Sequence, residues 1–113
     1  MIQIIHNPRC SKSREGLSYL VEKNIDYQII AYLDNPLTQE EIKDVLKKLN
    51  ISPIDLIRKN EAIWKEKYKN ATLTDEEIVE AMVQHPKLIE RPIFINDDRA
   101  VIGRPTERIT EIL

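Results

Sequence analysis

The chain has 113 residues, 42% of them hydrophobic and 32% charged, with a formal net charge of −2. This composition predicts one soluble globular domain over residues 1–113 and excludes a general nucleic-acid-binding surface, which would need an excess of positive charge. The single cysteine excludes a disulfide framework. The first residues fit neither a signal peptide nor a membrane span. Because one cysteine cannot form a disulfide framework, we expect a protein of the reducing cytoplasm.

The first third of the chain predicts a strand, a helix and a second strand. Residues 2–6 and 27–32 are short runs rich in apolar residues, and residues 12–23 place Leu20 and Val21 on the expected apolar face of a helix. A strand, helix and strand within about 30 residues imply a right-handed crossover between two parallel strands.

The middle of the chain, about residues 37–86, predicts a helical insert. Two capping boxes, Thr38 with Glu41 and Thr74 with Glu77, each indicate the start of a helix. Shorter helical segments are expected between these two helices.

The C-terminal part predicts a β-hairpin and a last helix. Residues 93–95 and 100–102 are apolar and are separated by a polar turn, which is typical of a hairpin. The helix begins near Thr106 and is expected to bury Ile112 and Leu113.

The complete order, β-α-β, helical insert and β-β-α, predicts an α/β chain with the thioredoxin-like fold. We expect a four-stranded mixed sheet of order 2-1-3-4, whose third strand is antiparallel to the first. Cys10 follows the first strand, where thioredoxin-like proteins carry their active thiol.

Cys10 is predicted to be a reactive thiolate. An isolated cysteine is most often a small buried hydrophobic residue, but residues 7–14 are polar and turn-forming, which disfavours a core position. The free N–H groups of the first helical turn favour a negative charge, and we expect Arg9, Lys12 and Arg14 to lower the thiol pKa further. Because the chain has no second cysteine, a redox cycle needs a thiol from outside.

Two Arg-Pro pairs, Arg91-Pro92 and Arg104-Pro105, flank the predicted hairpin. One interpretation is that each arginine is a solvent-exposed surface charge, which is the usual state of this residue. However, a following proline restricts the backbone that aims the side chain, and a guanidinium binds oxyanions through paired hydrogen bonds. The spacing therefore leaves a shared anion site as a hypothesis.

Four segments together resemble the ArsC family of glutaredoxin-coupled arsenate reductases. They are residues 6–14 (HNPRCSKSR), residues 56–58 (LIR), residues 85–92 (HPKLIERP) and residues 103–105 (GRP). The resemblance runs essentially from end to end and implies the thioredoxin-like fold with a helical insert.

The resemblance also implies a role for particular residues. By position, Cys10 matches the nucleophile, and Arg58, Arg91 and Arg104 match the oxyanion-binding arginines. The supporting residues are implied in the same way: Ser13 as the serine that hydrogen-bonds the thiolate, His6 as the histidine before the cysteine loop, and Pro92 as a cis-proline beside the cysteine. From its position alone, His6 either tunes Cys10 or simply ends a strand.

The implied activity is reduction of arsenate to arsenite. The Cys10 thiolate attacks arsenic, the arginines neutralise the oxygens, glutathione adds to arsenic, and glutaredoxin reduces the adduct. The expected partners are therefore arsenate or a similar oxyanion, glutathione and glutaredoxin, the last two acting as external reductants. We expect no bound cofactor, no metal site, no nucleic-acid or membrane partner, and a monomer.

Two other types of cysteine site are disfavoured because each would need a different residue at one position. A phosphatase loop of the Cys-x5-Arg type would need arginine where Gly16 stands, and a dithiol site would need cysteine where Ser13 stands. Two alternatives stay open: an Spx-type regulator that binds RNA polymerase, since the same family includes these, and an ArsC-family thiol oxidoreductase with another substrate. The complete arginine set and the lack of a Cys-x-x-Cys motif favour the arsenate reductase.

Overall fold

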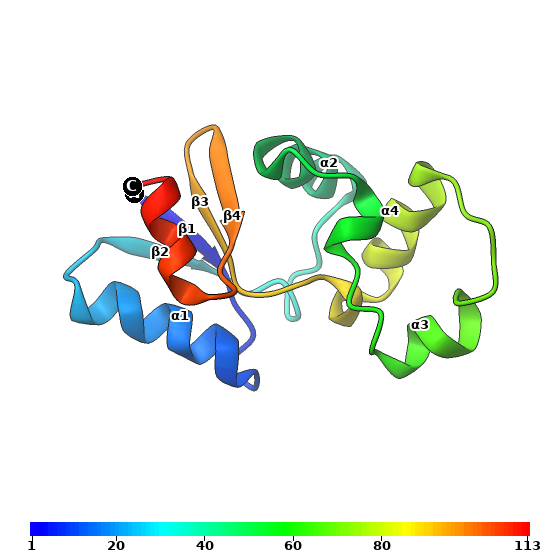
Figure 1. Ribbon diagram of the computed structural model, residues 1–113, viewed down its shortest axis with the longest axis horizontal. Coiled ribbons are helices and arrows are strands. Elements are labelled where there is room, and N and C mark those ends of the chain that lie inside the picture. The colour runs from blue at the N-terminus through cyan, green and yellow to red at the C-terminus, as the bar shows by residue number, and fades with distance from the viewer. The chain divides into compact units, whose positions relative to one another are not determined.

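The computed structural model describes residues 1–113 and divides into two compact units. The first unit joins Met1–Asn35 to Arg91–Leu113, and the second unit is Pro36–Glu90 (Figure 1). None of the helices has the length and apolar character needed to cross a bilayer.

A four-stranded sheet forms the centre of the first unit. The strands are β1 (Ile2–Ile5), β2 (Tyr27–Ile30), β3 (Ile93–Asn96) and β4 (Arg99–Ile102). Their order is β2-β1-β3-β4, with β1 parallel to β2 and antiparallel to β3, and with β3 antiparallel to β4. The predicted sheet order, hairpin and thioredoxin-like fold are confirmed.

Two helical elements, α1 (Ser11–Glu22) and η3 (Thr106–Glu111), cover one face of this sheet and lie beside one another (Figure 1). Apolar side chains from both elements and from three strands meet in one core. They are Ile2, Ile4, Leu20, Phe94, Val101, Ile109 and Ile112. Because α1 packs on the sheet, its first residue is held close to the end of β1.

Three details of the first unit differ from the sequence-based prediction. Val21 is 55% exposed and Leu113 is 54% exposed, although both were expected in the core. In each case the preceding residue, Leu20 or Ile112, takes the core-facing position. Successive residues of α1 point about 100° apart, so Val21 faces away from the core, whereas Leu113 lies beyond the end of η3. The last helix is also a 3-10 helix rather than an α-helix.

The second unit consists of helices. They are α2 (Gln39–Leu49), η1 (Pro53–Leu56), α3 (Ala62–Lys67), α4 (Asp75–Gln84) and η2 (Pro86–Leu88). Both predicted capping boxes are confirmed, because the Thr38 and Thr74 hydroxyls each accept the backbone N–H three residues later, at 3.2 Å in both cases. These caps begin α2 and α4 at the expected positions.

The chain has two glycines, and both pack against the start of β3. A Cβ atom on Gly103 would lie 2.5 Å from Phe94 Cε2 and 3.1 Å from Pro92 Cγ. A Cβ atom on Gly16 would lie 2.9 Å from Pro92 Cγ and 3.0 Å from Phe94 Cζ. Only a residue without a side chain fits at these positions, so α1 and the segment after β4 both approach Pro92 closely.

We predict that Gly103→Ala lowers the free energy of unfolding by about 1–3 kcal/mol, because the added methyl group overlaps the buried Phe94 ring. Val21→Ala serves as the control, since it removes exposed side-chain atoms and should change the stability by no more than about 0.5 kcal/mol. Urea unfolding monitored by circular dichroism measures both values. Equal stability of the two variants would contradict the described packing of Gly103.

Candidate active site

Cys10 lies at the N-cap of α1, directly after the loop that follows β1. Its backbone is extended, its N–H donates to the Asn7 carbonyl at 3.0 Å, and its carbonyl accepts from the Arg14 N–H at 2.9 Å. The backbone N–H groups of Ser13 and Lys12 hydrogen-bond the sulfur. The first turn of α1 therefore directs its free donors at the Cys10 side chain.

A buried hydrogen-bond network holds this loop in place. The Ser13 hydroxyl, which has no exposed surface, accepts the Asn7 N–H at 2.9 Å and lies 2.8 Å from His6 Nδ1. Asn7 Oδ1 in turn accepts the Arg9 N–H at 3.0 Å. Ser13 thus contacts the sulfur through its backbone N–H, whereas its hydroxyl stabilises the loop.

His6 lies one residue past β1 and is only 6% exposed. Burial lowers the pKa of its imidazole, a hydrogen bond with the Ser13 backbone raises that pKa in part, and the positive charge of Arg14 lowers it. A lowered pKa keeps the ring neutral at pH 7. The geometry therefore gives His6 a hydrogen-bonding contact with Ser13 rather than a positive charge near Cys10.

Two arginines from the ends of the hairpin reach the same sulfur. The buried Arg91 side chain hydrogen-bonds Cys10. Arg104 Nη2 lies 3.7 Å from Cys10 Sγ, and Arg104 Nε donates to the Arg91 carbonyl at 2.8 Å. The structure therefore brings Cys10, Arg91 and Arg104 together as predicted.

Both Arg-Pro peptide bonds that flank the hairpin, Arg91–Pro92 and Arg104–Pro105, are cis. The first was predicted and is confirmed, whereas the second was not anticipated. Between them, the Pro92 carbonyl accepts the Gly103 N–H at 2.8 Å, which joins the two segments that carry the arginines.

The pKa of the Cys10 thiol results from opposing contributions. Burial raises this pKa, but hydrogen bonds from the Ser13 N–H and the Arg91 side chain, the charge of Arg91, and the Lys12 N–H together lower it to about 7. The predicted lowering is confirmed. Cys10 therefore carries a substantial fraction of thiolate at neutral pH.

The sequence-based prediction assigned the positive charge that lowers the Cys10 pKa to the wrong residues. Arg9, Lys12 and Arg14 were expected to lower the pKa through their charges, but the charged side chain that does so is Arg91. The Arg14 guanidinium donates to the Pro8 carbonyl at 3.1 Å, which directs it to the loop backbone. The lowering of the Cys10 pKa that was expected from nearby cations thus comes from Arg91, which is distant in sequence.

Arg58 belongs to the second unit, where its own neighbours hold it. Its Nε lies 3.5 Å from a Glu61 carboxylate oxygen and its Nη1 lies 3.8 Å from a Glu90 carboxylate oxygen. Its participation in an anion site with the other two arginines stays a prediction.

The sequence patterns did not identify three supporting residues. Asn7 anchors the cysteine loop through its N–H, carbonyl and side chain, and the Asn-Pro dipeptide was a turn signal for it. Gly16 and Gly103 allow the close approach to Pro92, and their rarity in the chain was the available signal.

This arrangement combines a nucleophile with an anion-binding site. A thiolate is the reactive form of cysteine, and two guanidinium groups beside it supply fixed positive charge and several N–H donors. A tetrahedral oxyanion placed between them would have its central atom near Cys10 Sγ. The structure contains no group of three or more His, Cys, Asp and Glu residues placed to hold a metal ion.

Comparison with known proteins identifies relatives along the whole chain. A family model described as the ArsC family matches residues 5–112. A protein of Neisseria meningitidis named arsenate reductase is 40% identical over 99% of this chain and 97% of its own length, and one of Haemophilus influenzae with the same name is 42% identical over 97% of each chain. The solved structure of an arsenate reductase from Vibrio cholerae has a TM-score of 0.93 and 40% identity, and it covers 99% of this chain and 97% of its own.

We predict that Arg91→Met raises the midpoint of Cys10 alkylation from about 7 toward that of an ordinary thiol, about 8.5. The loss of the guanidinium removes a hydrogen bond and a positive charge from the thiolate, so the alkylation rate at pH 7 should fall about fivefold. In the wild-type protein the rate should fall as the pH drops through about 7, because the thiolate becomes protonated. The rate of reaction with iodoacetamide, measured from pH 5 to 10, gives each midpoint.

Arg9→Ala is the matched control, because it removes a cation from the same loop that does not contact the sulfur. It should leave the midpoint unchanged. A shift in Arg9→Ala as large as that in Arg91→Met would contradict the assignment of the charge effect to Arg91.

Proposed function

The chain belongs to the ArsC family, and we propose that it is an arsenate reductase that uses glutathione and glutaredoxin to convert arsenate to arsenite. The observation that carries this proposal is the position of Arg91 and Arg104 at the sulfur of a low-pKa cysteine. The names of the relatives support arsenate as the substrate.

The first step is attack on bound arsenate. Arg91 and Arg104 bind the oxygens through N–H donors and reduce the repulsion between the anionic substrate and the thiolate. Cys10 Sγ then forms a bond to arsenic, one As–O bond breaks, and the oxygen leaves as water after protonation. Arsenic remains in the +5 state.

The second stage is reduction by two external thiols. Glutathione displaces another oxygen and forms a second S–As bond, and a glutaredoxin thiolate then attacks the glutathione sulfur. The electron pair of that S–As bond stays with arsenic, which becomes +3, and the two thiols leave as a mixed disulfide. Water releases arsenite from Cys10, so that arsenate and two thiols yield arsenite, one disulfide and one water.

The remaining site residues position this chemistry. Ser13 and His6 hold the cysteine loop, and Pro92 joins the arginine-bearing segments. Arg58 is proposed as a third oxyanion-binding arginine with a smaller effect. The need for reduced glutathione agrees with a cytoplasmic location, and we expect the protein to act as a monomer without a bound cofactor.

We predict that the purified protein produces arsenite only when arsenate, glutathione and glutaredoxin are all present, and that Cys10→Ser abolishes this activity. Arg91→Lys and Arg104→Lys keep the charge but lose the paired hydrogen bonds, so each should lower kcat/KM for arsenate about 100-fold. Chromatographic separation of arsenite from arsenate gives the rates.

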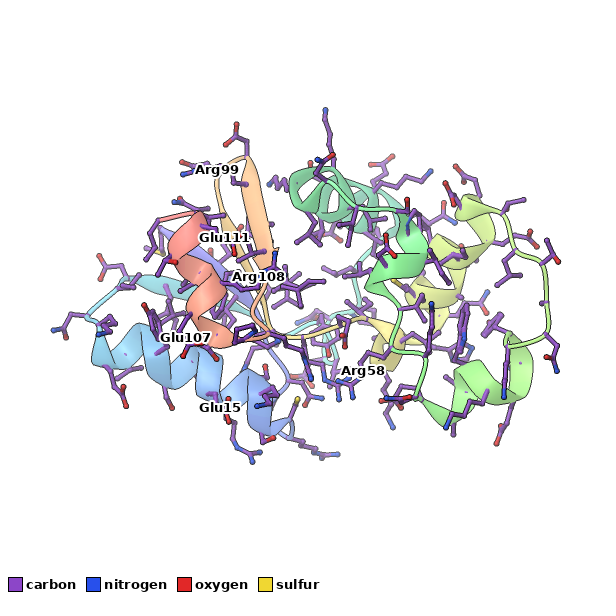
Figure 2. The ribbon with its side chains drawn as sticks, viewed as in Figure 1. Glu15, Arg58, Arg99, Glu107, Arg108 and Glu111 are labelled. Carbon is purple, nitrogen blue, oxygen red and sulfur yellow. The ribbon has the colours of Figure 1, made fainter.

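Arg99→Lys is the control for these variants. Arg99 lies at the start of β4 (Figure 2), and its Nη2 donates to the Ile112 carbonyl at 3.1 Å and not to Cys10. Its activity should equal that of the wild type. Activity in Cys10→Ser would contradict the proposal. A wild-type protein that leaves arsenate unreduced but binds RNA polymerase would favour the regulator, and one that acts on another oxyanion would favour the alternative substrate.

A further inference from the structure

A polar groove lies between α1 and η3 in the first unit. It consists of two adjoining cavities of about 440 and 530 Å³, which share Glu15, Thr106 and Glu107 as lining residues. Glu15 on α1 and Glu107 on η3 are labelled in Figure 2. Apart from Arg104, which lines one end, the residues of this groove have no role in the reaction steps described above.

The groove contains charges of both signs in equal number. Its lining includes Lys12, Arg14, Arg104, Glu15, Glu22 and Glu107. The Glu107 carboxylate is exposed and has no ion pair, and the Lys12–Glu15 pair, at 3.6 Å, is exposed and readily opened. Such a lining favours a small ligand with an ammonium group and carboxylates over a polyanion or an apolar molecule.

One end of the groove reaches the proposed active site. Arg104 lines this end, and its Nη2 lies 3.7 Å from Cys10 Sγ. Lys12 lines the same end and follows Cys10 by two residues. A ligand in the groove can therefore place one of its groups beside an atom bound to Cys10.

We propose that this groove binds the thiol co-substrate, a zwitterionic peptide thiol of the glutathione class; this inference rests on the proposed function. The Glu107 carboxylate binds the ammonium group, and the Lys12 ammonium binds a carboxylate. An extended tripeptide spans about 10 Å. Ser11 and Ser18 of α1 both line the groove. The helix rises about 10 Å between them, which matches the length of the tripeptide.

The groove would act by orienting one substitution at arsenic. The thiol of the bound peptide loses its proton, its sulfur forms a bond to the arsenic held on Cys10, and an As–O bond breaks. The proton leaves with that oxygen as water, and arsenic stays in the +5 state until the second thiol reduces it. Holding the peptide beside Cys10 raises the effective concentration of its thiol.

The test is a titration with S-methylglutathione, which keeps every charged group but cannot react at sulfur. Amide NMR shifts of the wild-type protein should change along α1 and η3. Glu107→Lys reverses the charge that binds the ammonium group and should weaken binding about tenfold. The matched control is Glu111→Lys. Glu111 lies on the same helix as Glu107 (Figure 2), pairs with Arg108 at 3.2 Å and is not among the residues that line the groove.

A kinetic measurement gives a second readout. The KM for glutathione should rise about tenfold in Glu107→Lys, while the KM for arsenate and both constants of Glu111→Lys stay unchanged. Arsenate reduction without shifts in the groove, or with equal binding by the two variants, would overturn this inference alone. Groove binding of S-methylglutathione by a protein that does not reduce arsenate would support the groove and overturn the proposed function.

Discussion

The stabilisation of a negative sulfur at the N-terminus of α1 is the interaction on which the rest of the site depends. The Ser13 and Lys12 N–H groups and the Arg91 guanidinium together outweigh the cost of burying the Cys10 thiolate. Helix N-termini favour negative charge, but here the added guanidinium comes from the far end of the chain. The same donors suit an incoming oxyanion, so one arrangement both activates the nucleophile and attracts its substrate.

This arrangement requires segments that are far apart in the sequence to pack against each other with little free space. Arg91 and Arg104 reach Cys10 because the start of β3 and the end of β4 are paired in the sheet. Gly16 and Gly103 both leave room for Pro92 and Phe94, so a methyl group at either position would force these segments apart. The Arg104 side chain is then directed by its hydrogen bond to the Arg91 carbonyl. Packing of small residues thus controls where the charges lie.

Much of the secondary structure and the position of the thiol could be predicted from short sequence patterns, because the interactions that produce them join residues close in sequence. The capping boxes at Thr38 and Thr74 and the thiol at a strand-to-helix junction depend on residues a few positions apart. The cation that lowers the Cys10 pKa could not be predicted in this way. It is Arg91, which contacts the sulfur although it lies 81 residues further along the chain, whereas of the three adjacent cations only Lys12 contributes, through its backbone N–H. The exposure of Val21 also depends on which neighbouring residue the tertiary core accepts. Long-range contacts therefore account for most of what the sequence patterns missed.

The proposed mechanism depends on a direct bond between Cys10 Sγ and arsenic at the site formed by Arg91 and Arg104. X-ray absorption at the arsenic K edge, recorded on the purified protein with arsenate and without glutathione, tests this claim directly. We expect one sulfur neighbour of arsenic in the wild-type protein and only oxygen neighbours in Cys10→Ser. An arsenic atom surrounded by oxygen alone in the wild-type protein, at arsenate concentrations that support turnover, would contradict this mechanism.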